Sequence, residues 1–378
     1  MIPFARIVKY GNSVIESTKV KQVNNKLDTL VLWEDGTLWG CGYNRYGQIT
    51  GGSSVDVQKD WVIISTGVKE ILGTWNNGFV ILMRDGKMMA AGDLTWAGLS
   101  TQGALQDVTA KLTISGKNIV QYSFSGPCVL VRTEDNVLYG LSSTLARGVL
   151  GTGVTTGSQM TLIQLATSVK FCATDGNESF YITTAGRLWC TGWNNGGNLG
   201  TGNSTQINTW QLSPTAPNDV VEVYPSYSLT VLVINTGVVY VCGNLATGLG
   251  TAKTTFSSMH PELVVLKDNY SLGVSGATTN AMVISNPSVN STIYFSGNLR
   301  YMGSGTNTND MGLWTTNYAA GLLDPTIVKT SFGYESNIWY DGKRMFFCGS
   351  QRYMPGYPSS SETVQFKELQ YPPGTDID

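Results

Sequence analysis

The chain has 378 residues and a formal net charge of −2, with charged side chains at 13% and hydrophobic ones at 42% of positions. This balance excludes a disordered chain, because the apolar residues suffice to bury a core. No run of Lys or Arg exceeds two residues, which argues against nucleic acid as the main partner. No apolar stretch reaches the roughly 18 residues that indicate a membrane-spanning helix.

One stretch near the N-terminus recurs along the chain. Residues 30–51 read LVLWEDGTLWGCGYNRYGQITG, in which two apolar runs flank the pair Asp35-Gly36 and a polar segment follows. Glycine reaches the positive φ angles that a tight hairpin turn requires. The stretch therefore predicts two strands joined by a two-residue turn, followed by a connection that contains Asn44 and Gly47.

The glycine that follows the second apolar run marks the period, and we call it the key glycine. Its positions are Gly42, Gly92, Gly192, Gly243, Gly297 and Gly349, with Ser142 in the third copy. The hairpin position ahead of it holds Gly36, Gly86, Asn136, Gly186, Gly237, Ser291 and Gly342. Successive key positions are 50 to 54 residues apart. A repeat of this length decides the architecture before any local prediction.

Four short strands are predicted in each copy, after a separate strand at 4–10. The first three copies give 20–23, 30–33, 38–41 and 61–66, then 68–72, 79–82, 88–91 and 110–114, then 120–124, 128–132, 137–141 and 161–165. The others give 169–173, 180–183, 188–191 and 209–212; 220–224, 231–234, 238–242 and 262–266; 271–274, 281–284, 292–296 and 321–323; and 327–332, 338–340, 345–348 and 363–369. This pattern predicts an all-β, seven-bladed propeller of four-stranded antiparallel blades.

We expect a single propeller domain over residues 20–370, with an N-terminal arm or ring-closing strand in 1–19 and a C-terminal tail in 371–378. The sequence predicts eight outer strands, whereas a ring of seven blades needs only seven. Either terminal strand could therefore close the ring. The other would lie over its neighbour, which is the favoured interpretation, or would attach the chain to another protein.

Catalytic and metal-binding patterns are weak. The six cysteines form no CxxC pair, so we expect buried, reduced thiols and no zinc site. The only histidine, His260, lies in a predicted loop, where solvation is its usual state. We find no nucleophile or phosphate-loop motif. The expectation is a protein that is not an enzyme and has no cofactor.

The segments 42–48 (GYNRYGQ), 192–200 (GWNNGGNLG) and 243–250 (GNLATGLG) resemble the repeats of the regulator of chromosome condensation family. The residues that carry the resemblance best are Asp35, Gly36, Trp39, Gly42, Asn44, Gly47, Gln48 and Gly51. The resemblance implies a seven-bladed propeller that binds something across one face. It does not imply the founding activity, guanine-nucleotide exchange on a small GTPase, because the repeat residues are structural.

Arginine and aromatic residues recur just past the key glycine, and we call them the Arg/aromatic arc. They are Arg45, Tyr46, Trp96, Arg300, Tyr301, Arg352 and Tyr353. In a closed ring they belong to contiguous blades, and such side chains are enriched at interfaces. The competing interpretation is that the aromatic residues pack between blades.

The favoured hypothesis is a structural or binding protein of a bacteriophage virion, in a tail, fibre, baseplate or decoration layer. A terminal arm would bind other virion proteins, and the Arg/aromatic arc would bind a host-surface glycan or protein. The low charge and the many Gly, Thr and Asn residues are typical of such proteins. The alternative is a cytoplasmic propeller that acts as a GTPase exchange factor or as an enzyme inhibitor. A carbohydrate-active enzyme is a third hypothesis, but the sequence lacks convincing paired carboxylates.

Overall fold

The computed structural model describes the chain in segments. These are residues 8–10, 13–15, 20–51, 55–99, 104–226, 229–244, 253–258, 271–275, 281–286, 292–296, 315–316, 329–332, 336–340, 344–352, 354–355, 357 and 362–369. Within them, no helix is long and apolar enough to cross a membrane.

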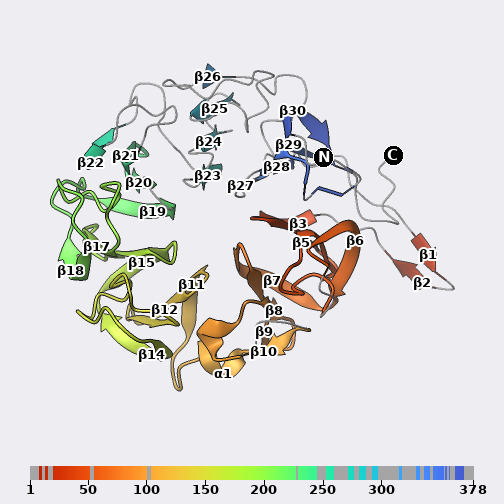
Figure 1. Ribbon diagram of the computed structural model, residues 1–378, viewed down its shortest axis with the longest axis horizontal. Coiled ribbons are helices and arrows are strands. Elements are labelled where there is room, and N and C mark those ends of the chain that lie inside the picture. Colours follow the sequence, from red (N-terminus) through yellow and green to blue (C-terminus); the bar gives the residue numbers. More distant parts are fainter. Residues whose placement is uncertain are drawn as a thin grey trace.

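The described strands form four-stranded antiparallel sheets that follow one another around a central axis, which is the arrangement of a β-propeller (Figure 1). Each sheet is one blade. In the first half of the chain the blades are β3 (Val20–Asn25), β4 (Asp28–Trp33), β5 (Leu38–Tyr43) and β6 (Val57–Ser65); β7 (Val68–Trp75), β8 (Gly78–Met83), β9 (Met88–Gly92) and β10 (Gln106–Asp107); and β11 (Ile119–Ser125), β12 (Cys128–Thr133), β13 (Leu138–Ser142) and β14 (Gln159–Ala166).

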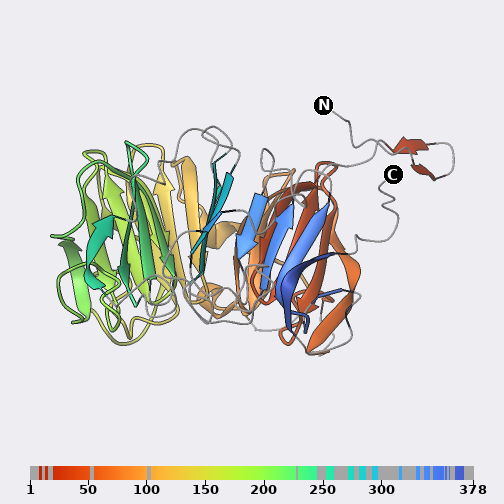
Figure 2. The same cartoon turned by 90° about the horizontal axis from the view of Figure 1, so that it is seen from above.

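The later blades have the same strand order. They are β15 (Val169–Thr174), β16 (Glu178–Thr183), β17 (Leu188–Gly192) and β18 (Ile207–Leu212); β19 (Val220–Ser226), β20 (Leu229–Ile234), β21 (Val239–Gly243) and β22 (Lys253–Ser258); β23 (Ser271–Ser275), β24 (Ala281–Asn286), β25 (Thr292–Ser296) and β26 (Thr315–Thr316); and β27 (Lys329–Phe332), β28 (Ser336–Tyr340), β29 (Met345–Ser350) and β30 (Glu362–Glu368). Figure 2 shows the strands running from one face of the ring to the other.

In three blades the outer strand differs from the predicted one. The segment predicted as a strand at 110–114 begins in helix α1 (Thr109–Leu112), and a two-residue strand, β10, pairs with β9 instead. Burial of Leu112 in the core explains why a helical turn replaces the strand there. The outer strands of the next-to-last two blades are β22 and β26, whereas the predicted 262–266 and 321–323 lie outside the described residues.

The hairpin turns have three residues, not the two predicted from Asp35-Gly36. Trp33 donates its N–H to the carbonyl of Thr37 at 3.0 Å, and Gly36 donates to the carbonyl of Trp33 at 3.0 Å. Gly36 has φ +93°, as expected for the last residue of such a loop. Asn136 occupies the same position with φ +61°, which confirms that asparagine substitutes for glycine there.

Some of these turns also join one blade to the next. The carbonyl of Gly36 accepts a hydrogen bond from the N–H of Val68, the first residue of β7, at 2.9 Å. Between inner strands, the side-chain amide of Gln22 bonds both backbone groups of Ile71, with its oxygen 2.8 Å from the Ile71 nitrogen. Gln121 holds Cys172 in the same way. Repeated polar bonds between blades therefore fix the register of the ring.

The ring closes between the first and last described blades. The backbone N–H of Asn25 donates to Ser331 Oγ at 2.7 Å, and its side-chain amide donates to the carbonyl of Ser336 at 2.8 Å. The C-terminal strand β30 pairs with β29 and so supplies the outer strand of the last blade. The N-terminal strand β1 (Val8–Tyr10) pairs with β2 (Ser13–Ile15) in a hairpin that lies outside the ring in both ribbon views.

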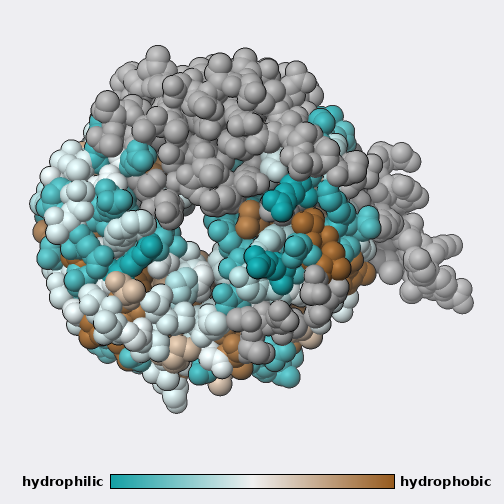
Figure 3. All heavy atoms as spheres, viewed as in Figure 1, coloured by the Kyte–Doolittle hydropathy of each residue, from teal (hydrophilic) through white to brown (hydrophobic). Residues whose placement is uncertain are grey.

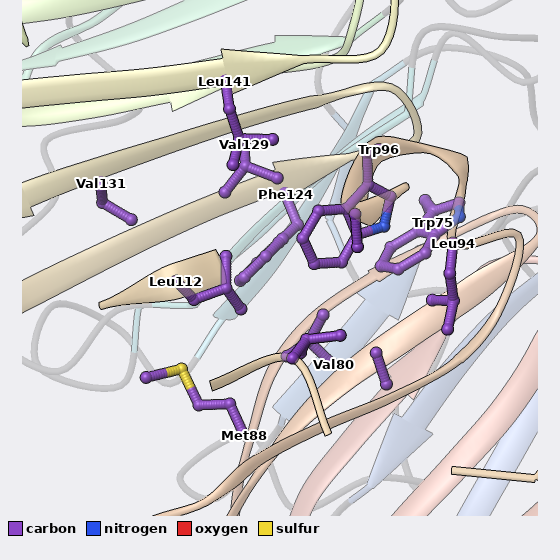
Figure 4. Packing of buried hydrophobic residues seen from close by; sticks show 13 residues of the cluster. Trp75, Val80, Met88, Leu94, Trp96, Leu112, Phe124, Val129, Val131 and Leu141 are labelled. Atoms are coloured by element: carbon purple, nitrogen blue, oxygen red, sulfur yellow. The ribbon is translucent and has the colours of Figure 1, made fainter. Parts of the chain in front are cut away.

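Apolar side chains fill the spaces between neighbouring blades. One such cluster contains Trp75, Val80, Trp96, Leu112 and Phe124 from the β7–β10 and β11–β14 blades (Figure 4). The cysteines belong to these interiors: all six are buried, and none of them forms a disulfide. Burial raises the pKa of the Cys128, Cys172 and Cys190 thiols to about 12. This confirms the expectation of buried thiols that act as small apolar side chains.

Candidate binding face

Antiparallel pairing puts two kinds of loop at one end of every blade. The short turn between the first and second strands lies beside the long connection between the third and fourth strands. We call this end of the ring the turn face, and the opposite end, which carries the three-residue hairpins, the hairpin face. The sequence-predicted Arg/aromatic arc belongs to the long connections of the turn face.

The repeat residues hold each long connection in shape. Gly42 has φ +105°, and Gly92, Gly192, Gly243 and Gly349 lie between +101° and +112°. A Cβ atom at Gly92 would lie 2.0 Å from the carbonyl oxygen of Asn77, in the short turn of the same blade. The key glycine therefore permits close contact between the two loops. Gly297 lies outside the described residues.

A buried asparagine two residues after the key glycine holds the connection in place by hydrogen bonds. Asn44 Oδ1 accepts the N–H of Ile49 at 2.8 Å, and its Nδ2 donates to Thr50 Oγ1 at 2.8 Å. Asn194 makes the matching bond to Leu199, at 2.9 Å. Gly47, with φ +71°, donates to the carbonyl of Asn44 at 2.9 Å and completes the turn. These residues are structural, and they leave the positions between Asn44 and Gly47 for other roles. Asp35 is also structural, since its Oδ1 accepts the N–H of Thr37 on the hairpin face.

Arg45 and Tyr46 occupy those two positions. Arg45 is exposed, and Tyr46 is half-buried with its ring 6.4 Å from that of Tyr43. Tyr46 also donates its backbone N–H to Gln48 Oε1 at 3.2 Å. The connection thus presents Arg45 to solvent from a rigid turn.

Arg352 lies at the position of Arg45 in the β27–β30 blade. One hydrogen bond of the turn is matched, because Met354 donates its N–H to the carbonyl of Gln351 at 3.2 Å, as Gly47 does to Asn44. Arg352 is exposed, and its blade is the direct neighbour of the β3–β6 blade. The structure therefore places Arg45 and Arg352 on the same face of adjacent blades. Arg300, Tyr301 and Tyr353 lie outside the described residues.

Trp96 was wrongly assigned to this arc. It lies in the 3-10 helix η1 (Thr95–Ala97) and is only 1% exposed. Its ring lies between Trp75 and Phe124, with centroid distances of 6.2 and 6.0 Å (Figure 4). Because the side chain fills the space between two blades, it is core and not a contact residue.

Arg147 is a residue of this kind that sequence reasoning missed. Its Cζ lies 4.0 Å from the ring centroid of half-buried Trp193, and its guanidinium donates to Asn177 Oδ1. It thereby connects the long connection of the β11–β14 blade to the β15–β18 blade. Gly47 follows its key glycine by five residues, but Gly148 follows Ser142 by six. That extra residue shifted Arg147 out of the expected register.

Carboxyl groups lie buried beneath the turn face. Asp28 is 1% exposed, and burial raises its pKa to about 8. Glu178 is fully buried, which raises its pKa well above its ordinary value, with further raising by Asp175. Asn198 Nδ2 donates to Glu178 Oε1 at 2.7 Å. The Asp28 carboxyl is therefore largely uncharged at neutral pH, and burial disfavours ionisation of the Glu178 carboxyl in the same way.

Lys26 belongs to the short turn of the β3–β6 blade. Burial lowers its pKa, while the carboxylates of Asp175 and Asp28 raise it. Asp175 lies in the corresponding turn of the β15–β18 blade, so the charges of the two blades act on each other. Figure 3 shows hydrophilic residues around the central opening on the face that it displays. Within the described part of the chain, no group of three or more His, Cys, Asp or Glu side chains could hold a metal ion.

Comparison with known proteins gives likeness in structure alone. No protein-family profile matches the sequence. No curated protein matches it either. The fold is similar to human WBSCR16, with TM-score 0.71, 13% identity and coverage of 89% of this chain and 94% of that one.

It is also similar to Prp20p from Saccharomyces cerevisiae, with TM-score 0.64, 17% identity and coverage of 84% and 80%. Yeast RCC1 (Prp20) bound to Kap60 gives TM-score 0.52 and 14% identity, with coverage of 93% and 75%. At these identities the likeness shows the fold only. The chain is thus an all-β propeller of four-stranded antiparallel blades, similar in fold to yeast RCC1.

Proposed function

We propose that this protein is a non-enzymatic binding propeller that recognises its partner across the turn face. The observation that carries the proposal is the pair of exposed arginines, Arg45 and Arg352, at matching positions of adjacent blades. Core packing does not require an exposed guanidinium, which is suited to planar, paired hydrogen bonds with carboxylates or sugar hydroxyls. The partner is therefore a protein or glycan that carries such groups.

The ring of this proposal has seven blades, one for each sequence copy. Support comes from the four-stranded sheets between β3 and β30 and from the bonds of Asn25 to Ser331 and Ser336. With one blade for each sequence repeat, all seven repeats belong to the ring. The exposed arginines then lie on one continuous arc.

The setting that we propose is a bacteriophage virion, in its tail, fibre, baseplate or decoration layer. Support comes from the low charge content and from the N-terminal hairpin. Within the described residues, β1 and β2 pair only with each other. A two-stranded hairpin is marginally stable by itself, so a partner protein would stabilise it. The hairpin would attach the ring, and the turn face would remain available to a host-surface receptor.

Particle composition tests the setting. Particles from the native source are purified on a density gradient, and this chain is quantified against the major shell protein by mass spectrometry. A fixed integer ratio is expected, and its value distinguishes a tail component from a shell component. Loss of the chain from particles, with the chain recovered in the soluble fraction, would exclude the virion setting.

Binding tests the face. The double substitution Arg45→Ala with Arg352→Ala is compared with Arg187→Ala, an exposed arginine on the hairpin face. Adsorption to host cells, or to isolated host-surface glycan, should fall at least tenfold for the double variant and remain unchanged for Arg187→Ala. Equal binding by both variants would refute the assignment of the turn face.

The alternative is a cytoplasmic propeller that binds a GTPase or inhibits an enzyme. Its support is the likeness in fold to Prp20p, which binds Gsp1p and histones. Accelerated nucleotide release from a GTPase of the same cell would support this alternative. Unchanged release with no complex formation would remove it.

A further inference from the structure

Two blades carry a buried carboxylic acid at the same position. Asp28 begins β4 and pairs with the key glycine Gly42, and Glu178 begins β16 and pairs with Gly192. The matching position of the β11–β14 blade holds Cys128, which pairs with Ser142. Each acid thus lies directly beneath the long connection of its own blade.

In both blades an amide side chain of that connection faces the acid. Asn198 follows Gly197 and donates to Glu178 at 2.7 Å. Gln48 follows Gly47 and is 1% exposed. No hydrogen bond of ordinary length reaches the Asp28 carboxyl oxygens, although Gln48 lies close enough to act on its pKa. A carboxyl group beneath an amide is therefore a repeated feature of the turn face.

Gln48 also connects the acid to the recognition residues. Its Oε1 accepts the backbone N–H of Tyr46 at 3.2 Å. The contacts run from the Asp28 carboxyl through the Gln48 amide to the turn that presents Arg45 and Tyr46. A change in charge at Asp28 must consequently be accommodated by this turn.

The groups around each acid do not neutralise a negative charge there. Lys26 and the Cys41 thiol interact electrostatically with Asp28, and the effect of Lys26 is smaller than that of burial. Asp175 also acts on Lys26, from the opposite blade.

Around Glu178 the charges oppose each other: Arg147 favours ionisation, whereas Asp175 disfavours it. The buried Cys242 thiol lies within its electrostatic reach. An unpaired carboxylate in such an interior is costly, and the chain avoids that cost by keeping the acid neutral or by opening the connection above it.

We propose that the buried carboxyl groups of Asp28 and Glu178 keep the two long connections closed only while these groups are uncharged, and that the connection carrying Arg45 and Tyr46 loosens as Asp28 ionises. The binding face is then held most rigidly in mildly acidic solution and less rigidly as the pH rises. The link to binding rests on the proposed function, whereas the lock itself does not.

Hydrogen exchange followed by mass spectrometry tests the lock on the isolated chain. Exchange of residues 44–51 is measured from pH 5 to pH 9 and corrected for the intrinsic rate. Residues 145–151 of the β11–β14 blade are the internal control, because Cys128 replaces the acid there. Gly148 donates to the carbonyl three residues before it, as Gly47 does, and Gly151 donates to the carbonyl of Gly148 as Gly51 does to that of Gly47.

The opening constant of residues 44–51 should rise by up to about tenfold per pH unit between pH 5 and pH 7 and level off above pH 8. Residues 145–151 should show no such rise. Asp28→Asn, which keeps the shape without the titration, should make residues 44–51 independent of pH. Glu178→Gln should do the same for residues 194–200 and leave residues 44–51 unchanged.

A corrected exchange rate at residues 44–51 that does not change with pH in the wild-type chain would overturn the proposal, even if neither variant folds. A rise that persists in folded Asp28→Asn would overturn it as well. No partner is present in the experiment, so loss of the proposed binding function would leave its result intact.

Discussion

The β3–β6 and β7–β10 blades use the same sequence position in opposite ways. Four residues past the key glycine, Tyr46 is half-buried on the turn face, whereas Trp96 is 1% exposed. The backbone explains the difference. In the first blade Asn44 and Gly47 hold an open turn, but in the second Leu94 replaces the asparagine and a 3-10 helix follows.

The comparison teaches that an apolar residue in place of the buried asparagine directs the connection inward. Leu94 is 1% exposed and belongs to the same cluster as Trp96. In the β7–β10 blade, apolar packing of Leu94 therefore holds the connection in place of the hydrogen bonds that Asn44 makes in the β3–β6 blade. Four predictions follow, from the largest expected effect to the smallest.

Trp96→Ala should lower the free energy of unfolding by about 4 kcal/mol, because it empties a space between two blades. Tyr46→Ala at the matching position should cost only about 1 kcal/mol, since its ring is half-exposed. Urea denaturation of both variants measures the two values. Equal losses would mean that the two connections are equally important to the core.

Gly92→Ala should cost about 3 kcal/mol, because the new Cβ would lie 2.0 Å from the Asn77 carbonyl oxygen at φ +101°. Gly86→Ala is the matched control in the same blade. Its φ is +90°, but nothing lies within 4 Å of the added atom, so about 1 kcal/mol is expected. If thermal unfolding shows equal losses, backbone strain alone is responsible and the close contact between loops contributes nothing.

Asp28→Asn should stabilise the chain by about 2 kcal/mol at pH 8. Burial raises the pKa of this carboxyl from 3.8 to about 8, so its contribution to stability is complete below about pH 4 and is lost as the pH rises to about 8. The gap between variant and wild type should therefore widen from pH 5 to pH 8 in thermal unfolding scans. Asp35→Asn, at an exposed hairpin, serves as the control; a constant gap would contradict the assignment.

Arg45→Ala together with Arg352→Ala should change stability by less than about 0.5 kcal/mol, because both side chains are exposed. Circular dichroism melting curves check this value before any binding assay. A larger loss would show that the arginines have a structural role, and reduced adsorption by the variant would no longer identify a binding face.

Much of the fold could be predicted from the sequence, because period and turn chemistry are local signals. The key glycines and Asn136 adopt the backbone angles that their residue types indicate. The length of the hairpin loop could not be derived from Asp35-Gly36, since the same pair suits loops of two and three residues. Helix α1 arises from the burial of Leu112, a tertiary effect that strand patterns do not contain.

The candidate site was less predictable. Arg45 and Arg352 are exposed as expected, but Trp96 shows that repeat position does not determine exposure. Arg147 escaped notice because one added residue in its connection shifts the register. The buried acids were missed for another reason: Asp28 and Glu178 look like ordinary surface carboxylates until the pairing opposite Gly42 and Gly192 is known.

The bonds of Asn25 to Ser331 and Ser336 join groups more than 300 positions apart in the chain. Contacts of such long sequence separation form late, because the intervening segment must first be ordered. During synthesis the first blade therefore waits, with one apolar face uncovered, until the last blade emerges from the ribosome. We expect the growing chain to depend on chaperones in that interval, and a premature stop before β27 to yield an aggregation-prone open ring.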